Sequence, residues 1–188
     1  LLQRDSDVAW AKASWFGDLA MFARSVTPIR KRAGDAGVPL TILTTRDHDS
    51  QLYHAQLAAI QRSQSYIYIE NPYFSDDVVL FELAKARRRG VDVRVILPDA
   101  GNHQTQNYSN EVAINTMLGI GIRVYMYPGM THVKAAIYDG WACFGSANFD
   151  KLSLQIIQPA FSLCALNIHL GKALVNRAAR FNLSFKGV

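Results

Sequence analysis

The sequence predicts an α/β domain in which helices alternate with the strands of a mixed β-sheet. Short apolar runs with the length of buried strands recur between residues 40 and 166. Segments with apolar residues at helical spacing separate several of these runs. Glycine and proline stand at many of the junctions, where they end helices and strands. This alternation predicts a sandwich of helices around a mixed sheet.

The first half of the alternating region is predicted from apolar periodicity and from residues that end an element. Leu52, Ala55 and Ile60 recur on one face of a helix. Gly90 stops a second helix, and Pro98 ends the strand after it. The predicted elements are a strand at Leu40–Thr44, a helix at Gln51–Arg62, a strand at Tyr66–Glu70, a helix at Asp77–Arg89 and a strand at Val91–Leu97.

The second half obeys the same rules. Gly119 closes a helix, and a run bounded by Gly140 and Gly145 is short and apolar, as a buried strand would be. The predicted elements are a helix at Asn110–Leu118, a strand at Ile122–Tyr127, a hairpin of Lys134–Asp139 and Trp141–Phe144, a strand at Ala160–Leu166 and a helix at Leu170–Phe181.

The first 37 residues differ in pattern from the rest. Residues 8–25 are apolar and aromatic at mostly helical spacing, whereas residues 27–39 are rich in charge, glycine and proline. We therefore expect an N-terminal helix and linker at residues 1–37, either the tail of a preceding half or a helix packed on the main domain. The main domain is expected at residues 38–188.

Composition excludes a disordered chain. Of the 188 residues, 49% are hydrophobic and 19% charged, which is typical of a globular protein. Because the chain starts at Leu1, we expect a processed or truncated product, and a membrane anchor could lie outside it. The net charge of +5 fits two polyanionic partners, phospholipid headgroups and nucleic acid, and separates neither. Cys143 and Cys164 lack metal-ligand spacing and are expected to be buried thiols.

The stretch from His132 to Asn148 holds the residues best suited to chemistry. His132 and Lys134 are two apart at the start of a strand, so their side chains share one face. A cation beside a histidine is poor core material. Lysine is a point charge for phosphate oxygens, and an imidazole can attack phosphorus or pass a proton. This pair therefore predicts a phosphate site.

These residues resemble the signature of the phospholipase D superfamily, H-x-K-x4-D followed by G-S-x-N. Further similarity lies in Ile67–Phe74, Gly90–Pro98 and Gly145–Leu154, which look like landmarks of the cardiolipin-synthase-like branch. The resemblance covers roughly residues 38–156. It implies a mixed-sheet α/β/α sandwich of the phospholipase D type, with residues 38–188 as one catalytic half and no cofactor.

The resemblance also implies a role for each motif residue. His132 would be the nucleophile that forms a phosphohistidine, and Lys134 the phosphate clamp. Ser146 and Asn148 would donate hydrogen bonds to the same oxygens. Asp139 would support the site, although an Asp-Gly pair here equally predicts a hairpin turn. No metal is expected, because lysine and the hydrogen-bond donors supply the charge.

One motif is half of the machinery in the resembled family, where one histidine attacks and another acts as acid. We therefore expect a second His-x-Lys motif from another copy of the chain or from a missing N-terminal half. The other partners expected are a phospholipid substrate and a membrane surface, with a peripheral location, or else nucleic acid.

Weaker candidates lie outside the motif. Glu70, Asn71 and Tyr73 end a predicted strand and could line a pocket, or cap the strand instead. His103 lies in a polar loop that could rim the same pocket. The basic run Lys85–Arg89 ends a helix, where cations interact favourably with the helix dipole.

Two departures from the family pattern bear on activity. Five residues, not six, separate Asp139 from Gly145, and a tighter turn would have to absorb the difference. Pro159 stands where the family tends to carry Asn-x-Glu. The residues are compatible with three hypotheses: a phospholipase D or phosphatidyltransferase acting on phospholipid, which is favoured; a nucleic-acid phosphodiesterase acting as a dimer; and a non-catalytic half of a two-motif protein.

Overall fold

The computed structural model describes residues 40–46, 49–100, 104–150, 161–166 and 184–186. Its strands and helices alternate as the sequence predicts. In chain order they are β1 (Leu40–Arg46), β2 (Asp49–Ser50), α3 (Gln51–Arg62), β3 (Tyr66–Glu70), α4 (Asp77–Arg88), β4 (Asp92–Pro98), α5 (Gln104–Gly119), β5 (Arg123–Tyr127), β6 (Ala135–Tyr138), β7 (Trp141–Gly145), β8 (Phe161–Leu166) and β9 (Ser184–Lys186).

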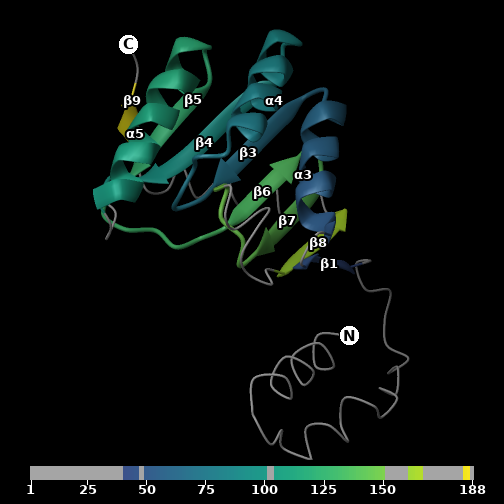
Figure 1. Cartoon of the computed structure of the whole chain (residues 1–188). Coiled ribbons are helices and arrows are strands. Elements are labelled where there is room, and N and C mark those ends of the chain that lie inside the picture. Colours follow the sequence, from purple (N-terminus) through teal and green to yellow (C-terminus); the bar gives the residue numbers. More distant parts are fainter. Residues whose placement is uncertain (1–39, 47–48, 101–103, 151–160, 167–183, 187–188) are drawn as a thin grey trace, which may run out of the picture. The chain divides into compact units, whose positions relative to one another are not determined.

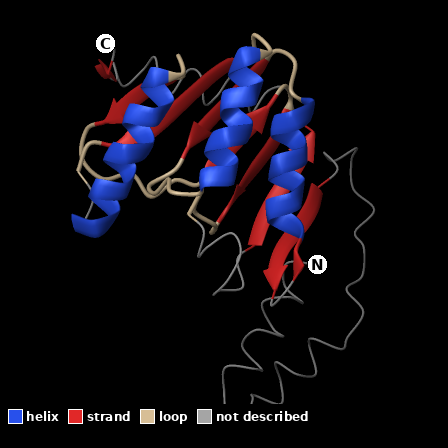
Figure 2. Ribbon diagram, turned by 45° about the horizontal axis from the view of Figure 1, so that its top comes forward, coloured by secondary structure: helices blue, strands red, loops and turns tan. Residues whose placement is uncertain are grey.

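The described strands form one mixed sheet in the order β2-β1-β8-β7-β6-β3-β4-β5-β9. The neighbours β3, β4 and β5 are parallel, and the other pairs are antiparallel. Helices α3, α4 and α5 lie side by side on one face of the sheet (Figures 1 and 2). The predicted α/β fold with a mixed sheet is therefore confirmed.

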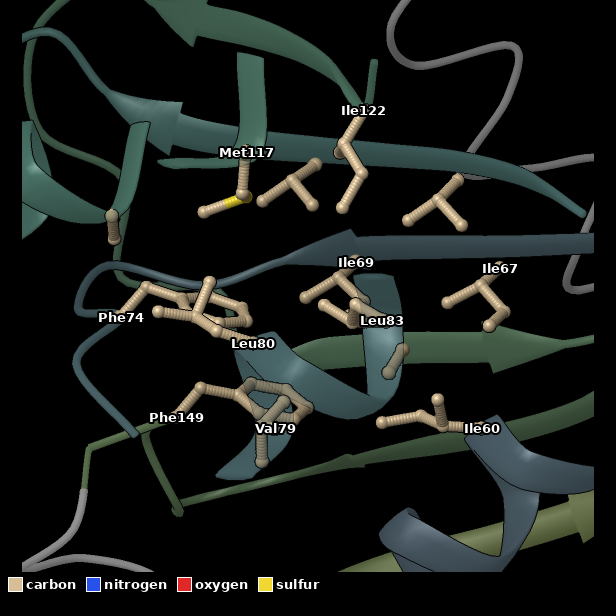
Figure 3. Close-up of a cluster of buried hydrophobic side chains, with 14 of the residues drawn as sticks. Ile60, Ile67, Ile69, Phe74, Val79, Leu80, Leu83, Met117, Ile122 and Phe149 are labelled. Carbon is tan, nitrogen blue, oxygen red and sulfur yellow. The ribbon is translucent and has the colours of Figure 1, made fainter. Parts of the chain in front are cut away.

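The core lies between the sheet and these three helices. Figure 3 shows Ile67 and Ile69 of β3 facing Leu83 of α4, and all three side chains are fully buried. Ile60 of α3 and Met117 of α5 belong to the same cluster. Each buried aliphatic side chain contributes about 1.5–3 kcal/mol to folding, so this shared face holds the helices on the sheet.

Helix α4 shows how local residues place an element. Asp76 is its N-cap, and its Oδ1 accepts a hydrogen bond from the Val79 backbone N–H at 2.9 Å. The helix stops before Gly90, whose φ of 92° is a left-handed conformation that favours glycine. Both signals lie in the sequence, and the predicted helix is one residue longer than the observed one.

A tight hairpin joins β6 to β7. Tyr138 and Trp141 pair directly, so only Asp139 and Gly140 form the connection. Asp139 has a φ of 55°, which aspartate tolerates better than most residues, and the Gly140 N–H donates to the Tyr138 carbonyl at 2.7 Å. This is the tighter turn that the short spacing before Gly145 requires.

The carboxylate of Asp139 ties this turn to the start of β3. Its oxygens accept hydrogen bonds from three successive backbone N–H groups, those of Gln64 at 2.7 Å, Ser65 at 3.0 Å and Tyr66 at 2.8 Å. The hydroxyl of Tyr66 donates back to the Asp139 carbonyl at 2.8 Å. Partial burial alone would raise the pKa of Asp139, but the three backbone donors outweigh it and hold that pKa below its ordinary value.

Several sequence expectations differ from the structure or lie outside it. Helix α5 begins at Gln104, six residues before the predicted Asn110, because its first turns are polar and carry no apolar period. The short strands β2 and β9 were not predicted. The thiols of Cys143 and Cys164 are buried and are not joined in a disulfide, as expected. The segment 1–37, the helix at Leu170–Phe181 and Pro159 lie outside the described residues, so the domain division stays a prediction.

We predict that Asp139→Asn lowers the free energy of unfolding at pH 7 by about 1–2 kcal/mol, because it removes the charge that strengthens the three backbone hydrogen bonds. Solvent screening at this partly exposed position keeps the loss modest. Asparagine tolerates the positive φ, so the change keeps the backbone conformation while it removes the charge and one of the two accepting oxygens. The pKa of Asp139 is lowered in the folded state, so its contribution is present above the ordinary value of 3.8 and is lost as pH falls through the lowered value. Denaturant titrations between pH 7 and pH 2 measure this difference.

The matched control is Asp99→Asn, which removes an exposed carboxylate after β4. It should leave stability within about 0.5 kcal/mol of the parent. Equal losses for both variants, or a loss for Asp139→Asn that does not shrink at low pH, would contradict the role given to Asp139.

Candidate active site

The site forms at the edge of the sheet where the parallel strands β3, β4 and β5 end. Strand β6 runs antiparallel to β3, and Ala135 at its start pairs with Glu70 at the end of β3. The residues just before β6 therefore lie at this edge. The segment of His132 and Lys134 is not itself part of a strand. The pairing of β6 with β3 brings it to this edge.

The side chains of His132 and Lys134 contact one another, although their segment precedes β6 and is not the strand start that the sequence predicted. Lys134 Nζ lies 3.1 Å from His132 Nε2 and 3.2 Å from the His132 carbonyl oxygen. An ammonium has no lone pair, so in this contact Nζ donates the hydrogen bond and Nε2 accepts it. His132 is exposed and Lys134 is half-buried. The imidazole is thus reachable, and its neighbouring cation is partly shielded from water.

Burial sets the proton affinity of Lys134. Partial desolvation lowers the pKa of its ammonium, and the nearby carboxylate of Asp150 opposes this in part. Lys134 consequently holds its proton less firmly than an exposed lysine does. A phosphate oxygen brought to Nζ would restore a favourable environment for that charge.

The turn after β7 lies beside Lys134. The Gly145 N–H donates to the Lys134 carbonyl at 3.0 Å, which brings the start of the Gly-Ser-Ala-Asn turn against the His-x-Lys segment. Ser146 in this turn is exposed, and Asn148 is half-buried. The structure therefore gathers His132, Lys134, Ser146 and Asn148 at one edge of the sheet.

Glu70 and Asn71 lie beneath this group and not on its surface. Both are 0% exposed, and their hydrogen bonds fit the alternative of a cap on the strand; a place for them in a pocket stays a prediction. Glu70 Oε1 accepts a hydrogen bond from the Thr131 hydroxyl at 2.8 Å. Asn71 Oδ1 accepts from the backbone N–H groups of Tyr73 at 3.2 Å and Phe149 at 3.3 Å. Their side-chain oxygens thus accept hydrogen bonds from the loops that carry the site.

Tyr73 is also buried, at 8% exposed. The segment around it is clamped from α5, because Asn110 donates from Nδ2 to the Pro72 carbonyl at 2.8 Å and accepts at Oδ1 from the Phe74 N–H at 2.9 Å. Phe74 stacks on Phe149 with ring centroids 5.1 Å apart (Figure 3). This packing joins the segment after β3 to the turn after β7.

Asp139 does not join the site. It lies at the other end of β6 from Lys134, and five residue steps of extended chain, about 17 Å, separate the two. Its carboxylate is occupied by three backbone donors at the start of β3. These contacts fit the structural alternative, the hairpin turn, with the added function of a clamp on β3, and the supporting role implied by the resemblance stays a prediction.

The remaining sequence candidates do not add to this group. His103 lies outside the described residues. In the basic run that ends α4, Lys85 pairs with Glu82 at 2.8 Å, Arg87 donates to the Gly121 carbonyl at 2.8 Å and Arg89 donates to the Ile60 carbonyl at 2.8 Å. These contacts give the run a structural role.

Two residues that bear on the site were not singled out from the sequence. Asp150 interacts electrostatically with Lys134, and Thr131, the residue before His132, donates from its hydroxyl to Glu70. Asp150 directly follows the Gly-Ser-Ala-Asn-Phe stretch and Thr131 directly precedes His132, so adjacency to the motif was the available signal.

No cluster of three metal-ligating side chains is present among the described residues. None of the helices in that part of the chain has the length and apolar character to cross a bilayer. The described residues thus place an exposed imidazole beside an ammonium, with a hydroxyl and an amide side chain in the adjacent turn.

Comparison with known sequences identifies a family. Residues 56–163, more than half of the chain, match the profile described as "Cardiolipin synthase, PLD-like domain". Cardiolipin synthase A of Escherichia coli O157:H7 is 32% identical over 109 residues, which cover 56% of this chain and 22% of that protein. Cardiolipin synthase 2 of Bacillus anthracis is 34% identical over 108 residues, covering 56% and 20%. The chain thus spans about a fifth of the length of these relatives.

Comparison with solved structures supports the same fold. The phospholipase D family member Nuc from Salmonella typhimurium matches with a TM-score of 0.68 at 18% identity, covering 81% of this chain and all of that one. Phosphatidylserine synthase from Haemophilus influenzae matches with a TM-score of 0.58 at 15% identity, covering 76% and 38%. At these identities the likeness concerns the fold. The mixed sheet and the profile match over residues 56–163 together establish that the chain belongs to the phospholipase D-like domain family of cardiolipin synthases.

Proposed function

We propose that the chain cleaves or transfers phosphodiesters of phospholipids through a phosphohistidine on His132. The observation that carries the proposal is the contact between Lys134 Nζ and His132 Nε2 at 3.1 Å. It pairs an exposed imidazole with a lysine ammonium. A nucleophile and a charge clamp at the same point are what attack on phosphorus requires.

The contact also suggests how the nucleophile is released. In the structure the ammonium of Lys134 donates a hydrogen bond to the Nε2 lone pair of His132. A phosphodiester oxygen is a charged acceptor and a stronger partner for Nζ than a neutral ring nitrogen. Substrate binding would draw Nζ to the phosphate and leave the Nε2 lone pair available for attack.

The reaction then proceeds in two displacements. Nε2 of His132 forms a bond to phosphorus as the bond to the leaving oxygen breaks, and an acid protonates that oxygen. Water or an alcohol next attacks the phosphohistidine, giving up its proton and returning the imidazole. Lys134, Ser146 and Asn148 stabilise the phosphoryl oxygens in both transition states.

Phospholipid is the proposed substrate because the relatives that match at 30% identity or more are cardiolipin synthases. The net charge of +5 is compatible with this substrate and with nucleic acid alike. A paired assay on phosphatidylcholine vesicles and single-stranded DNA separates the two. Cleavage of DNA alone would replace the lipid by nucleic acid, and no turnover on either would favour a non-catalytic half.

The proposal includes a second His-x-Lys motif from another polypeptide segment. Attack and leaving-group protonation occur on opposite sides of an in-line phosphorus, so one histidine serves poorly for both. The second motif would come from another copy of this chain or from the remainder of a longer protein. The match to about a fifth of the relatives' length is compatible with either source.

We predict that His132→Ala abolishes turnover and the covalent phosphoryl-enzyme, because the other motif side chains offer no neutral nucleophile near pH 7. Reactions with radiolabelled substrate, quenched in alkaline denaturant because the P–N bond of phosphohistidine is labile in acid, and followed by mass spectrometry of the labelled peptide, measure the adduct. Since the His132 ring is exposed, the variant should keep its unfolding transition. Label retained on the alanine variant would place the nucleophile elsewhere.

Lys134→Met should reduce kcat by about 10²–10³-fold, the range seen when one preorganised transition-state donor is removed, with little change in KM. Its matched control is Lys134→Arg, which keeps the charge. Because burial lowers the pKa of Lys134, activity of the parent should fall on the alkaline side before an ordinary lysine would titrate. In the Lys134→Arg variant this alkaline decline in activity should shift to higher pH. A raised KM with unchanged kcat in the methionine variant would reduce Lys134 to a binding role.

If two copies build the site, mixing should report it. At equal amounts of parent and His132→Ala chains, about a quarter of randomly paired dimers hold two intact histidines, so activity should fall to that fraction and not to half. Mass photometry or sedimentation of the same samples gives the oligomeric state. Full activity from a strictly monomeric chain would contradict the need for a second motif.

A further inference from the structure

We propose that the consecutive residues Glu70 and Asn71 are positioning residues. From beneath the site they hold its two segments, the one that carries His132 and the turn that carries Asn148. The inference rests on the proposed function and adds residues that do not touch the phosphate. Both side chains are 0% exposed at the end of β3. A polar group is buried at a cost unless its hydrogen bonds are made, so their partners indicate what they stabilise.

Glu70 holds the segment that carries His132. Its Oε1 accepts from the hydroxyl of Thr131 at 2.8 Å, and the Thr131 oxygen lies 3.5 Å from the backbone N–H of Val133. Thr131 is buried, at 4% exposed. The chain is therefore held on both sides of His132 by one hydroxyl that is itself anchored on a buried carboxylate.

Asn71 holds the turn that carries Asn148. Its Oδ1 accepts from the Phe149 N–H at 3.3 Å, and its Nδ2 donates to the Ala147 carbonyl at 3.5 Å. The residues before and after Asn148 are thus bound to one amide. The Asn71 N–H also donates to the Ile96 carbonyl at 3.2 Å, which ties the amide's own backbone to the end of β4.

The nucleophile segment and the donor turn already meet through the backbone hydrogen bond from Gly145 to Lys134. Because Glu70 and Asn71 are covalently adjacent, they add a second link between the two segments, from beneath, over a single peptide unit. A displacement of about 1 Å in a reacting group can reduce a rate about 10²-fold. The pair gives the phosphate site its internal spacing.

The test removes the hydroxyl of Thr131 without changing its shape. Thr131→Val should lower kcat by about 10–100-fold with KM little changed. Thr131→Ser keeps the hydroxyl and should restore most of kcat. Thr116→Val is the matched control, because the Thr116 hydroxyl donates within α5, to the Val112 carbonyl at 2.8 Å, far from the motif in sequence. It should leave kcat unchanged.

A second readout does not depend on turnover. Amide hydrogen exchange at Val133 and the imidazole NMR signals of His132 should change in Thr131→Val and revert in Thr131→Ser, while Thr116→Val leaves them as in the parent. If the parent has no phosphodiesterase activity, the proposed function fails but this arm still tests the positioning. Unchanged exchange and imidazole signals in Thr131→Val, or a serine variant no better than valine, would overturn the proposal.

Asn71 is tested by a parallel substitution. Asn71→Asp preserves the shape but removes the Nδ2 donor to Ala147. It should perturb the backbone NMR signals of Ala147 to Phe149 and lower kcat, with the Val133 signal unaffected. Perturbation of both segments together, or of neither, would contradict separate anchoring by the two residues.

Discussion

The carboxylate of Asp139 is the contact on which the placement of the site depends. It accepts three backbone N–H groups at the start of β3 and so ties the β6–β7 turn to that strand. This contact fixes how far β6 lies along β3, and the register then brings Ala135 opposite Glu70. A slip of one residue would reverse the facing of every side chain in β6. The clamp acts at the far end of the strand from the chemistry.

Mixing parallel and antiparallel strands makes the edge chemically useful. The parallel strands β3, β4 and β5 all end there, and their connections return over α4 and α5 on the same face. The antiparallel β6 begins at that edge, so the segment before it is delivered to the same place. An arrangement of this kind collects loops from distant parts of the sequence around a rigid sheet.

The polar layer under the site is buried and hydrogen-bonded to the loops above it. Glu70, Asn71 and Asn110 direct their side-chain groups to those loops, and the stacked rings of Phe74 and Phe149 fill the space beside them. Apolar packing alone would hold these loops without specifying their geometry, whereas each hydrogen bond is directional. The exposed pair of His132 and Lys134 is thereby presented from a rigid base.

Much of this protein is determined by its sequence. Gly90, Pro98 and the apolar periods gave the helices α3 and α4 and most strands within two residues, because those signals are local. The spacing of His132 and Lys134 placed both side chains together for the same reason. Tertiary structure alone decided that Asp139 clamps β3 and that Glu70 and Asn71 lie beneath the site, since these roles depend on partners as many as 78 residues away. It also decided the start of α5, whose polar first turns carry no local period. Local propensity is determined by neighbouring residues, but the hydrogen-bond partner of a buried polar group is determined only once the strands have paired.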